Sequence, residues 1–316
     1  MLLLFVTVLS GAFLWAVFNI VNSYFLRDKK VPEDVMTIAS SLGILASCVV
    51  AELIYDLTRE ELPTITGEFW FNFAIFALLN VLLIPLNVRA YKLEDASIVA
   101  SLSSSMPMFV IFMSWILLQE WPTFYGRVAI GCIALGAYVL RLKGAEVQLP
   151  SVVAKVLPCR WHGNAVFLFG PWLRLFSSKG ARLALLVAYL GAVAINFEKL
   201  AILASTPMIA NAGCYLVVVG FIYAWSKNKK ESDNWVNLDK SQFRIIFFLS
   251  FVVMGLSEIL MGIGFYYGIV PYVGALKRTQ ILWTVILAGI ILKEKNAFTR
   301  IIGALIIFIG TVLIAF

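Results

Sequence analysis

Two adjacent cations interrupt an apolar segment near the carboxyl end of the chain. Lys277 and Arg278 lie one third of the way along residues 270–292, a segment long enough to cross a bilayer as a helix. A charge at that depth costs at least about 2.5 kcal/mol unless it meets an opposite charge, protein or water. We therefore expect both cations to face a polar interior, where they could hold an anionic group of a solute.

Glu198, Glu258 and Lys199 are expected near the same depth. Counted from the nearest turn residues at about 1.5 Å per residue, all five charges lie roughly 9–15 Å below one membrane surface. In one interpretation these charges only neutralise one another, with Glu258 paired to Arg278. Glu198 then pairs with Lys277, and Lys199 is left over or reaches the membrane interface. In the other, Lys277 or Arg278 holds an anionic group, and Glu258 or Glu198 exchanges protons. Three cations against two carboxylates favour an anionic group. The pattern leaves both interpretations open, together with a third, in which the helices end elsewhere and some of these charges lie at the membrane interface.

Neutral side chains on three segments complete the candidate site. Gln280 and Trp283 follow the cations on the same segment, and Trp283 is the aromatic residue most expected near a solute. Asn19 lies in the first apolar segment. Ser103 and Ser104 are the positions that an internal repeat aligns with the two cations. Hydroxyl-rich faces also pack helices closely in lipid. The two serines could therefore either hydrogen-bond the solute or pack against a neighbouring helix.

The composition indicates that membrane helices must position these residues. Of the 316 residues, 61% are hydrophobic and the mean hydropathy is +0.92, against about 45–50% apolar residues in soluble domains. The net charge of +7 does not indicate nucleic-acid binding, because the lysines and arginines lie at loop ends. Ten apolar spans are expected: residues 2–26, 35–57, 69–91, 95–118, 124–142, 181–204, 207–226, 243–268, 270–292 and 298–316.

The fourth and fifth of these spans align with the ninth and tenth at a constant shift of 174 residues. The shift pairs Glu120 with Glu294, Phe124 with Phe298 and Gly136 with Gly310. The chain therefore divides into a first five-helix repeat (1–142), an interfacial connector (143–180) and a second five-helix repeat (181–316). Because each repeat has an odd number of helices, the two repeats cross the membrane in opposite orientations. A substrate site is expected between such repeats, near the midplane.

The paired repeat endings, and above all the run from Val270 to Ile314, resemble the EamA-type members of the drug/metabolite transporter superfamily. The resemblance covers nearly the whole chain apart from residues 146–170. It implies a ten-helix, 5+5 inverted-repeat carrier of small organic metabolites. Substrates in that superfamily range over amino acids, sugars, nucleotide-sugars, drugs and polyamines, so the resemblance leaves the substrate open.

These features predict a secondary transporter that moves a small organic metabolite, such as an amino acid or another anion-bearing solute, by alternating access. An integral membrane enzyme and a non-transporting membrane scaffold are the alternatives. No catalytic set argues for an enzyme. No cofactor or metal is expected, because the only histidine, His162, forms with Cys159 a set far short of a metal site. Expected partners are the solute and membrane lipid but no nucleic acid, and a homodimer is left open.

The basic residues predict how the chain lies in a cell (plasma) membrane. Twenty of the 25 lysines and arginines fall in the odd-numbered connections, and only Arg59 and Arg127 fall in the even-numbered ones. By the positive-inside rule, the odd connections are cytoplasmic and both termini are non-cytoplasmic. Many superfamily members are thought to have both termini inside, so this orientation departs from the resemblance.

Overall fold

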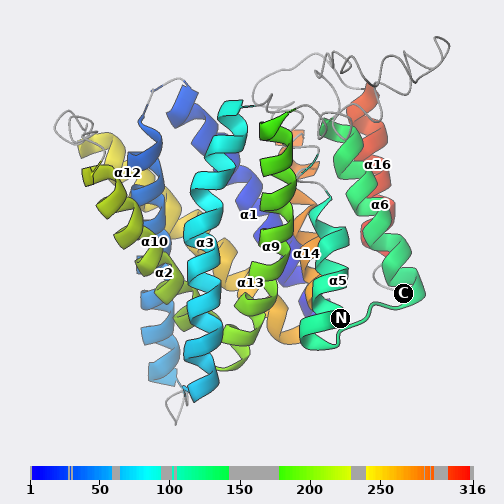
Figure 1. Cartoon of the computed structure of the whole chain (residues 1–316), viewed down its shortest axis with the longest axis horizontal. Coiled ribbons are helices and arrows are strands. Elements are labelled where there is room, and N and C mark those ends of the chain that lie inside the picture. The colour runs from blue at the N-terminus through cyan, green and yellow to red at the C-terminus, as the bar shows by residue number, and fades with distance from the viewer. Residues whose placement is uncertain are drawn as a thin grey trace. The chain divides into compact units, whose positions relative to one another are not determined.

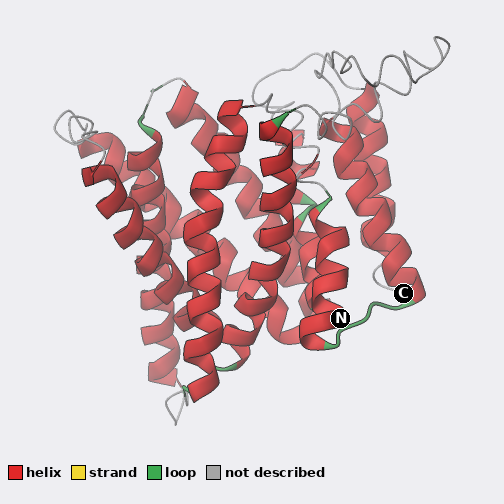
Figure 2. Cartoon of the chain, viewed as in Figure 1, coloured by secondary structure: helices red, strands yellow, loops and turns green. Residues whose placement is uncertain are grey.

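The computed structural model describes most of the chain as helices. Its described residues are 2–27, 29, 31–58, 65–93, 102, 105–141, 178–228, 240–280, 282–284, 286–287 and 298–313. Every regular element in these ranges is helical (Figure 2). The prediction of an all-α protein is therefore confirmed for the described part of the chain.

The helices follow the predicted apolar spans, because each span can satisfy its backbone hydrogen bonds internally only as a helix. In chain order they are α1 (Leu2–Arg27), α2 (Glu33–Thr58), α3 (Gly67–Leu93), α5 (Met106–Leu118), α6 (Phe124–Arg141), α9 (Lys179–Leu203), α10 (Pro207–Asn228), α12 (Lys240–Leu249), the π-helical turn η3 (Ser250–Met254), α13 (Gly255–Tyr267), α14 (Val270–Lys277) and α16 (Phe298–Leu313). Five described stretches are long and apolar enough to cross a membrane: Leu2–Val21, Asp34–Thr58, Lys179–Leu203, Pro207–Trp225 and Lys240–Tyr267.

The eighth predicted span contains a π-helical turn that the sequence did not predict. It divides the span into α12, η3 and α13. Gly43 of α2 approaches this turn closely. A Cβ atom on Gly43 would lie 2.5 Å from the carbonyl oxygen of Phe247 and 2.9 Å from the backbone nitrogen of Phe251. Single π-helical turns of this kind are frequent at functional sites.

The ninth predicted span contains a tightened turn, which the sequence also did not predict. α14 ends at Lys277, and the N–H of Arg278 donates to the carbonyl of Ala275 at 2.9 Å. The N–H of Thr279 donates three residues back in the same way, which is the 3₁₀ pattern. The α-helical pattern returns where the N–H of Trp283 donates to Thr279 at 3.1 Å. The two cations therefore lie at an irregular point of the span.

The chain forms two compact units, and each takes segments from both halves of the sequence. The first unit comprises Met1–Val81 and Ala194–Glu294, and the second comprises Leu82–Val193 and Lys295–Phe316. The helices α3 and α9 each contribute to both units. The compact units are thus a different division of the chain from the predicted repeats, each of which runs continuously in sequence.

In the first unit, α2 packs along α10, and α1 packs along α13 and α14 (Figure 1). Gly255 and Gly262 lie on either side of Glu258 on α13, where they could make room for a helix or for a ligand. The side chain of Ser47 on α2 fills the space beside Gly255, and Pro207 of α10 fills the space beside Gly262. Both glycines therefore serve close packing between helices.

A hydrophobic cluster lies between the helices of the first unit. Trp15 of α1 and Tyr215 of α10 pack against its edge. Because the cluster contacts several helices at once, it fixes the positions from which polar side chains project. Its buried members are Phe18, Phe25, Val31, Val35, Met36, Ala39, Ile44, Cys48, Ile246 and Met254.

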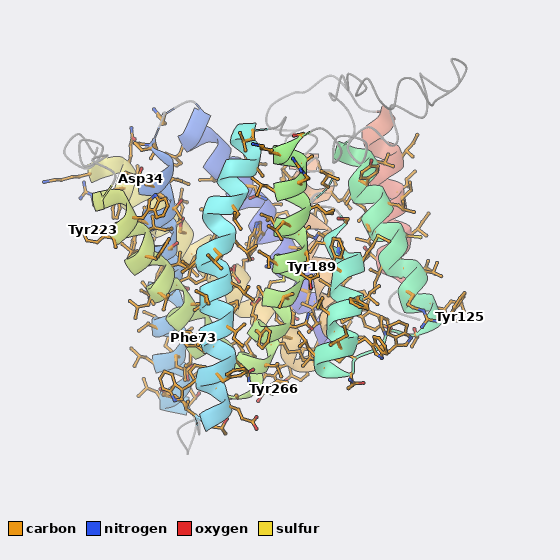
Figure 3. The ribbon with its side chains drawn as sticks, in the orientation of Figure 1. Asp34, Phe73, Tyr125, Tyr189, Tyr223 and Tyr266 are labelled. Carbon is orange, nitrogen blue, oxygen red and sulfur yellow. The ribbon has the colours of Figure 1, made fainter. Side chains whose placement is uncertain are left out.

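The two ends of the first unit carry exposed aromatic side chains. Figure 3 shows Tyr223, near the end of α10, at the same end as Asp34, and Tyr266, near the end of α13, at the opposite end. Both tyrosines are more than half exposed, as is typical of aromatic residues at the two membrane interfaces. The α9–α10 and α13–α14 connections lie at the Tyr266 end, because α10 begins there and α13 ends there.

In the second unit, α6 and α16 pack through a reciprocal contact. A Cβ atom on Gly136 would lie 2.7 Å from the carbonyl oxygen of Gly303 on α16. A Cβ atom on Gly310 would lie 2.7 Å from the carbonyl oxygen of Ala129 on α6. Adding 174 to Ala129 and Gly136 gives Gly303 and Gly310, so the contact maps onto itself under the predicted repeat. The pairing also makes the helices antiparallel, as they are drawn in Figure 1.

Candidate functional site

Lys277 lies against an aromatic ring of another helix. Its Nζ is 4.1 Å from the ring centroid of Trp15 on α1, which packs along α14. An ammonium over the face of a tryptophan ring is stabilised by about 2 kcal/mol when water is excluded. This contact explains how a half-buried lysine is tolerated within an apolar span, and it holds the ammonium in one place.

Glu258 lies on the neighbouring helix, α13, and is only 4% exposed. The hydroxyl of Tyr215 on α10 donates a hydrogen bond of 2.9 Å to its Oε1. The adjacent Ser257 faces the other way and donates at 2.8 Å to the carbonyl oxygen of Gly11 on α1. A buried carboxylate needs such a donor, because an unpaired charge is expensive in a low-dielectric interior. α10 and α1 thus fix α13 from two sides.

Glu198 on α9 is a second buried carboxylate, 8% exposed. It lies within electrostatic range of the Lys277 ammonium and of the Glu258 carboxylate. The same hydrophobic cluster is bordered by Trp15, whose ring contacts the Lys277 ammonium, and by Tyr215, which binds Glu258. The first unit therefore brings one cation and two carboxylates from three helices into one electrostatically connected group.

Lys199 is not left over. Its Nζ donates a hydrogen bond of 2.8 Å to the carbonyl oxygen of Gly268, the residue that ends α13. A cation at a helix carboxyl end stabilises the exposed carbonyl groups and the helix dipole. Lys199 thus joins α9 to the end of α13. Arg278 is half-buried and also takes part in an interaction.

Glu52 of α2 lies beside the α9–α10 connection. The hydroxyl of Thr206 donates to its Oε2 at 2.7 Å. The same hydroxyl accepts from the N–H of Ile209 at 3.1 Å, so Thr206 caps the start of α10. This pair ties α2 to that connection.

Gln280 and Trp283 carry buried polar atoms that lack partners. Neither Oε1 of Gln280 nor Nε1 of Trp283 has a hydrogen-bond partner in the described part of the chain. The ring of Trp283 packs edge-to-face against Phe13 of α1, with centroids 5.5 Å apart. Buried donors and acceptors are nearly always paired, so an unpaired acceptor and donor one helical turn apart suit a ligand.

The remaining predicted residues are placed less fully. Asn19 is half-buried on α1, one turn from Trp15, and takes part in an interaction. Ser103 and Ser104 lie outside the described residues. Cys159 and His162 also lie outside them, and no group of three metal-ligating side chains occurs within the described ranges.

Sequence reasoning missed two residues of this region, Tyr215 and Asn211. Both lie on α10, one helical turn apart. Tyr215 binds Glu258, and the amide nitrogen of Asn211 is buried without a partner in the described part of the chain. Two polar side chains at that spacing, after the helix-starting Pro207, were the available signal. They do not stand out because α10 carries no charge beside them.

Comparison with known proteins decides the family. The EamA-like transporter family matches residues 2–142 and 178–316, in two blocks that together cover most of the chain. The chain belongs to the EamA-like transporter family. The resemblance drawn from the sequence is thereby confirmed, together with the two-repeat architecture and the multi-pass membrane class. Members of this family are transporters, which at family level favours transport over enzyme activity.

Two individual proteins are similar to this EamA-family chain. A WAT1-related protein of Arabidopsis thaliana is 25% identical over 325 aligned residues, which cover 97% of this chain and 82% of that protein. A solved crystal structure matches 99% of this chain and 98% of its own, with a TM-score of 0.71 at 14% identity. At that identity the second likeness shows the fold alone.

Proposed function

We propose that the chain is a secondary carrier that moves a small, anion-bearing organic metabolite across the plasma membrane by alternating access. One observation carries the proposal: in a member of a transporter family, Lys277 is held on Trp15 within an apolar interior, beside a buried carboxylate. The Trp15 ring holds the ammonium without neutralising it. An anionic group can therefore compete for it.

The proposed architecture is ten transmembrane helices in a 5+5 inverted repeat. The family match in two blocks, separated by residues 143–177, supports this division. The antiparallel, reciprocal contact of α6 and α16 supports opposite orientation, because equivalent helices of inverted repeats must run in opposite directions. Substrate would then bind where the repeats meet, and rocking of the repeats would expose it to each side in turn.

The proposed binding role of each residue follows from its chemistry. Lys277 and Arg278 hold the anionic group, and Gln280 and Trp283 supply an acceptor and a donor for neutral groups of the solute. Asn19, Ser103 and Ser104 are further candidates from the first repeat. Glu258 and Glu198 are the candidates for proton exchange, since both are buried acids and Glu198 lies within electrostatic range of the Lys277 ammonium and of Glu258.

Lys277→Gln tests the binding role. We expect a panel of small organic anions to contain one that raises the melting temperature of the unsubstituted protein in detergent, because a ligand stabilises the state it binds. That rise should be lost in Lys277→Gln. The matched control is Lys240→Gln at the exposed start of α12, which should keep it. A full response in Lys277→Gln would refute the role of Lys277.

Proton coupling is the finer part of this proposal. In vesicles, transport by the unsubstituted protein should depend on pH, and Glu258→Gln should remove that dependence, since glutamine cannot exchange a proton. Transport that is indifferent to pH before and after the substitution would refute coupling through Glu258. The carrier function would remain.

The orientation in the membrane is proposed from the basic residues alone. Both termini are placed on the non-cytoplasmic side. A reporter enzyme fused after Phe316 should be active outside the cytoplasm, and activity only in the cytoplasm would refute this topology.

A further inference from the structure

We propose that Asn211 of α10 is a further solute-binding residue, whose amide donates a hydrogen bond to a neutral acceptor group of the transported solute. The inference rests on the proposed carrier function. It adds a residue from α10, the helix whose Tyr215 binds Glu258.

Asn211 combines deep burial with an unpaired donor. The residue is 2% exposed, and its Nδ2 has no hydrogen-bond partner in the described part of the chain. An amide donor that leaves water without gaining a partner destabilises the folded state, and native structures hold few such groups. A partner from outside the chain removes that cost, so the donor is placed where a ligand would be bound.

The contacts of α10 with α13 place Asn211 near Glu258. Pro207 packs against Gly262, and Tyr215 binds Glu258, so the two helices run antiparallel at this contact. Asn211 lies midway between Pro207 and Tyr215, four residues from each. Residues four apart share a helix face, so Asn211 lies on the face that meets α13, level with the stretch from Glu258 to Gly262.

The neighbouring charge decides which group of a solute suits each residue. Beside Glu258, a carboxylate of the solute would be repelled, whereas a carbonyl, hydroxyl or ether oxygen can accept from the amide of Asn211. The anionic group suits Lys277, which is held on Trp15. The substrate class is therefore a small organic anion that carries a neutral hydrogen-bond acceptor away from its anionic group.

Asn211→Leu tests the inference, because leucine has nearly the same volume and no donor. Two measurements are made on the full chain: melting without solute, and titration with lactate, whose hydroxyl is a neutral acceptor, and with benzoate, which has no such group. We expect the solute-free melting temperature to rise by about 1–3 °C. Affinity for lactate should fall about tenfold, and affinity for benzoate should not change. A purely structural role predicts a fall in melting temperature and an unchanged affinity.

Asn196→Leu on α9 is the matched control. Asn196 is equally buried but takes part in an interaction, so its loss should lower the melting temperature. A fall in the solute-free melting temperature of Asn211→Leu would overturn the inference, whether or not a solute binds. If Lys277→Gln still weakens solute binding in that case, the carrier function stands. If no solute binds the unsubstituted protein and vesicles that contain it show no solute flux, the carrier function itself fails.

Discussion

At the residue scale, three charges inside the described part of the chain are tolerated because each has a specific neighbour on another segment. Lys277 lies on Trp15, Glu258 accepts from Tyr215, and Lys199 donates to the carbonyl of Gly268, directly after α13. These neighbours differ in whether the charged group can still bind a further ion. An aromatic ring stabilises an ammonium without neutralising it, so Lys277 keeps the ability to bind an anion.

Replacing Trp15 tests that interpretation. Trp15→Leu removes the ring face and should destabilise the protein by about 2 kcal/mol. Trp15→Phe keeps an aromatic ring that attracts the ammonium less strongly, so its stability should lie between that of the unsubstituted protein and that of Trp15→Leu. Thermal melting in detergent measures the order of stability of the unsubstituted protein and the two variants. Phe13→Leu, two residues away on α1, is the control for loss of aromatic packing without loss of the cation contact, and an equal effect at both positions would contradict the role of Trp15.

The bond between Tyr215 and Glu258 makes a second prediction. Tyr215→Phe leaves a buried carboxylate short of a donor and should cost about 1–3 kcal/mol. The same substitution in a Glu258→Gln background should cost less, because the neutral amide depends less on that donor. A double-mutant cycle from chemical or thermal unfolding measures the difference. Equal costs in both backgrounds would mean that the bond contributes nothing.

At the element scale, small residues decide how closely helices approach. Gly255 and Gly262 admit Ser47 and Pro207, and the π-helical turn lies against Gly43. In the second unit, Gly136 and Gly310 let the backbones of α6 and α16 touch. Gly136 meets the carbonyl of Gly303, and Gly310 meets the carbonyl of Ala129, the equivalent position under the 174-residue shift. The contact between α6 and α16 therefore has the two-fold character of an isologous interface.

This reciprocity predicts equal effects from two distant substitutions. Gly136→Ala and Gly310→Ala each place a methyl group against backbone atoms, and each should destabilise by about 1–3 kcal/mol. Gly131 is on the same helix as Gly136, and a Cβ atom there would meet nothing within 4 Å. Gly131→Ala should therefore be neutral or slightly stabilising. Unequal losses at the two reciprocal sites would argue against an equivalent role in two repeats.

At the scale of the whole molecule, the sequence predicts the helices and the repeat better than it predicts the site. Long apolar runs admit only helices in lipid, and a constant shift of 174 residues identifies the pair that proves reciprocal. Depth alone placed Glu198 near Lys277. The partners Trp15, Tyr215 and Gly268 could not be predicted, because they depend on which helices pack together rather than on any one helix.

The irregular turns were also beyond the sequence. No proline or glycine lies within the π-helical turn Ser250–Met254 or within the tightened turn at Lys277–Thr279. Both arise where a neighbouring helix or a change in hydrogen bonding alters the local geometry. Apolar patterning therefore predicted where each helix runs and left out where it departs from regular geometry.

The most direct test of the account is solute flux through proteoliposomes. For the carboxylate that best stabilises the purified protein, we expect counterflow into vesicles that hold the same compound, because a carrier exchanges solute across the membrane. Lys277→Gln should reduce that flux at least about tenfold while leaving the protein folded. Flux that is absent from the unsubstituted protein, or that survives in full in Lys277→Gln, would contradict a carrier whose site is built on Lys277.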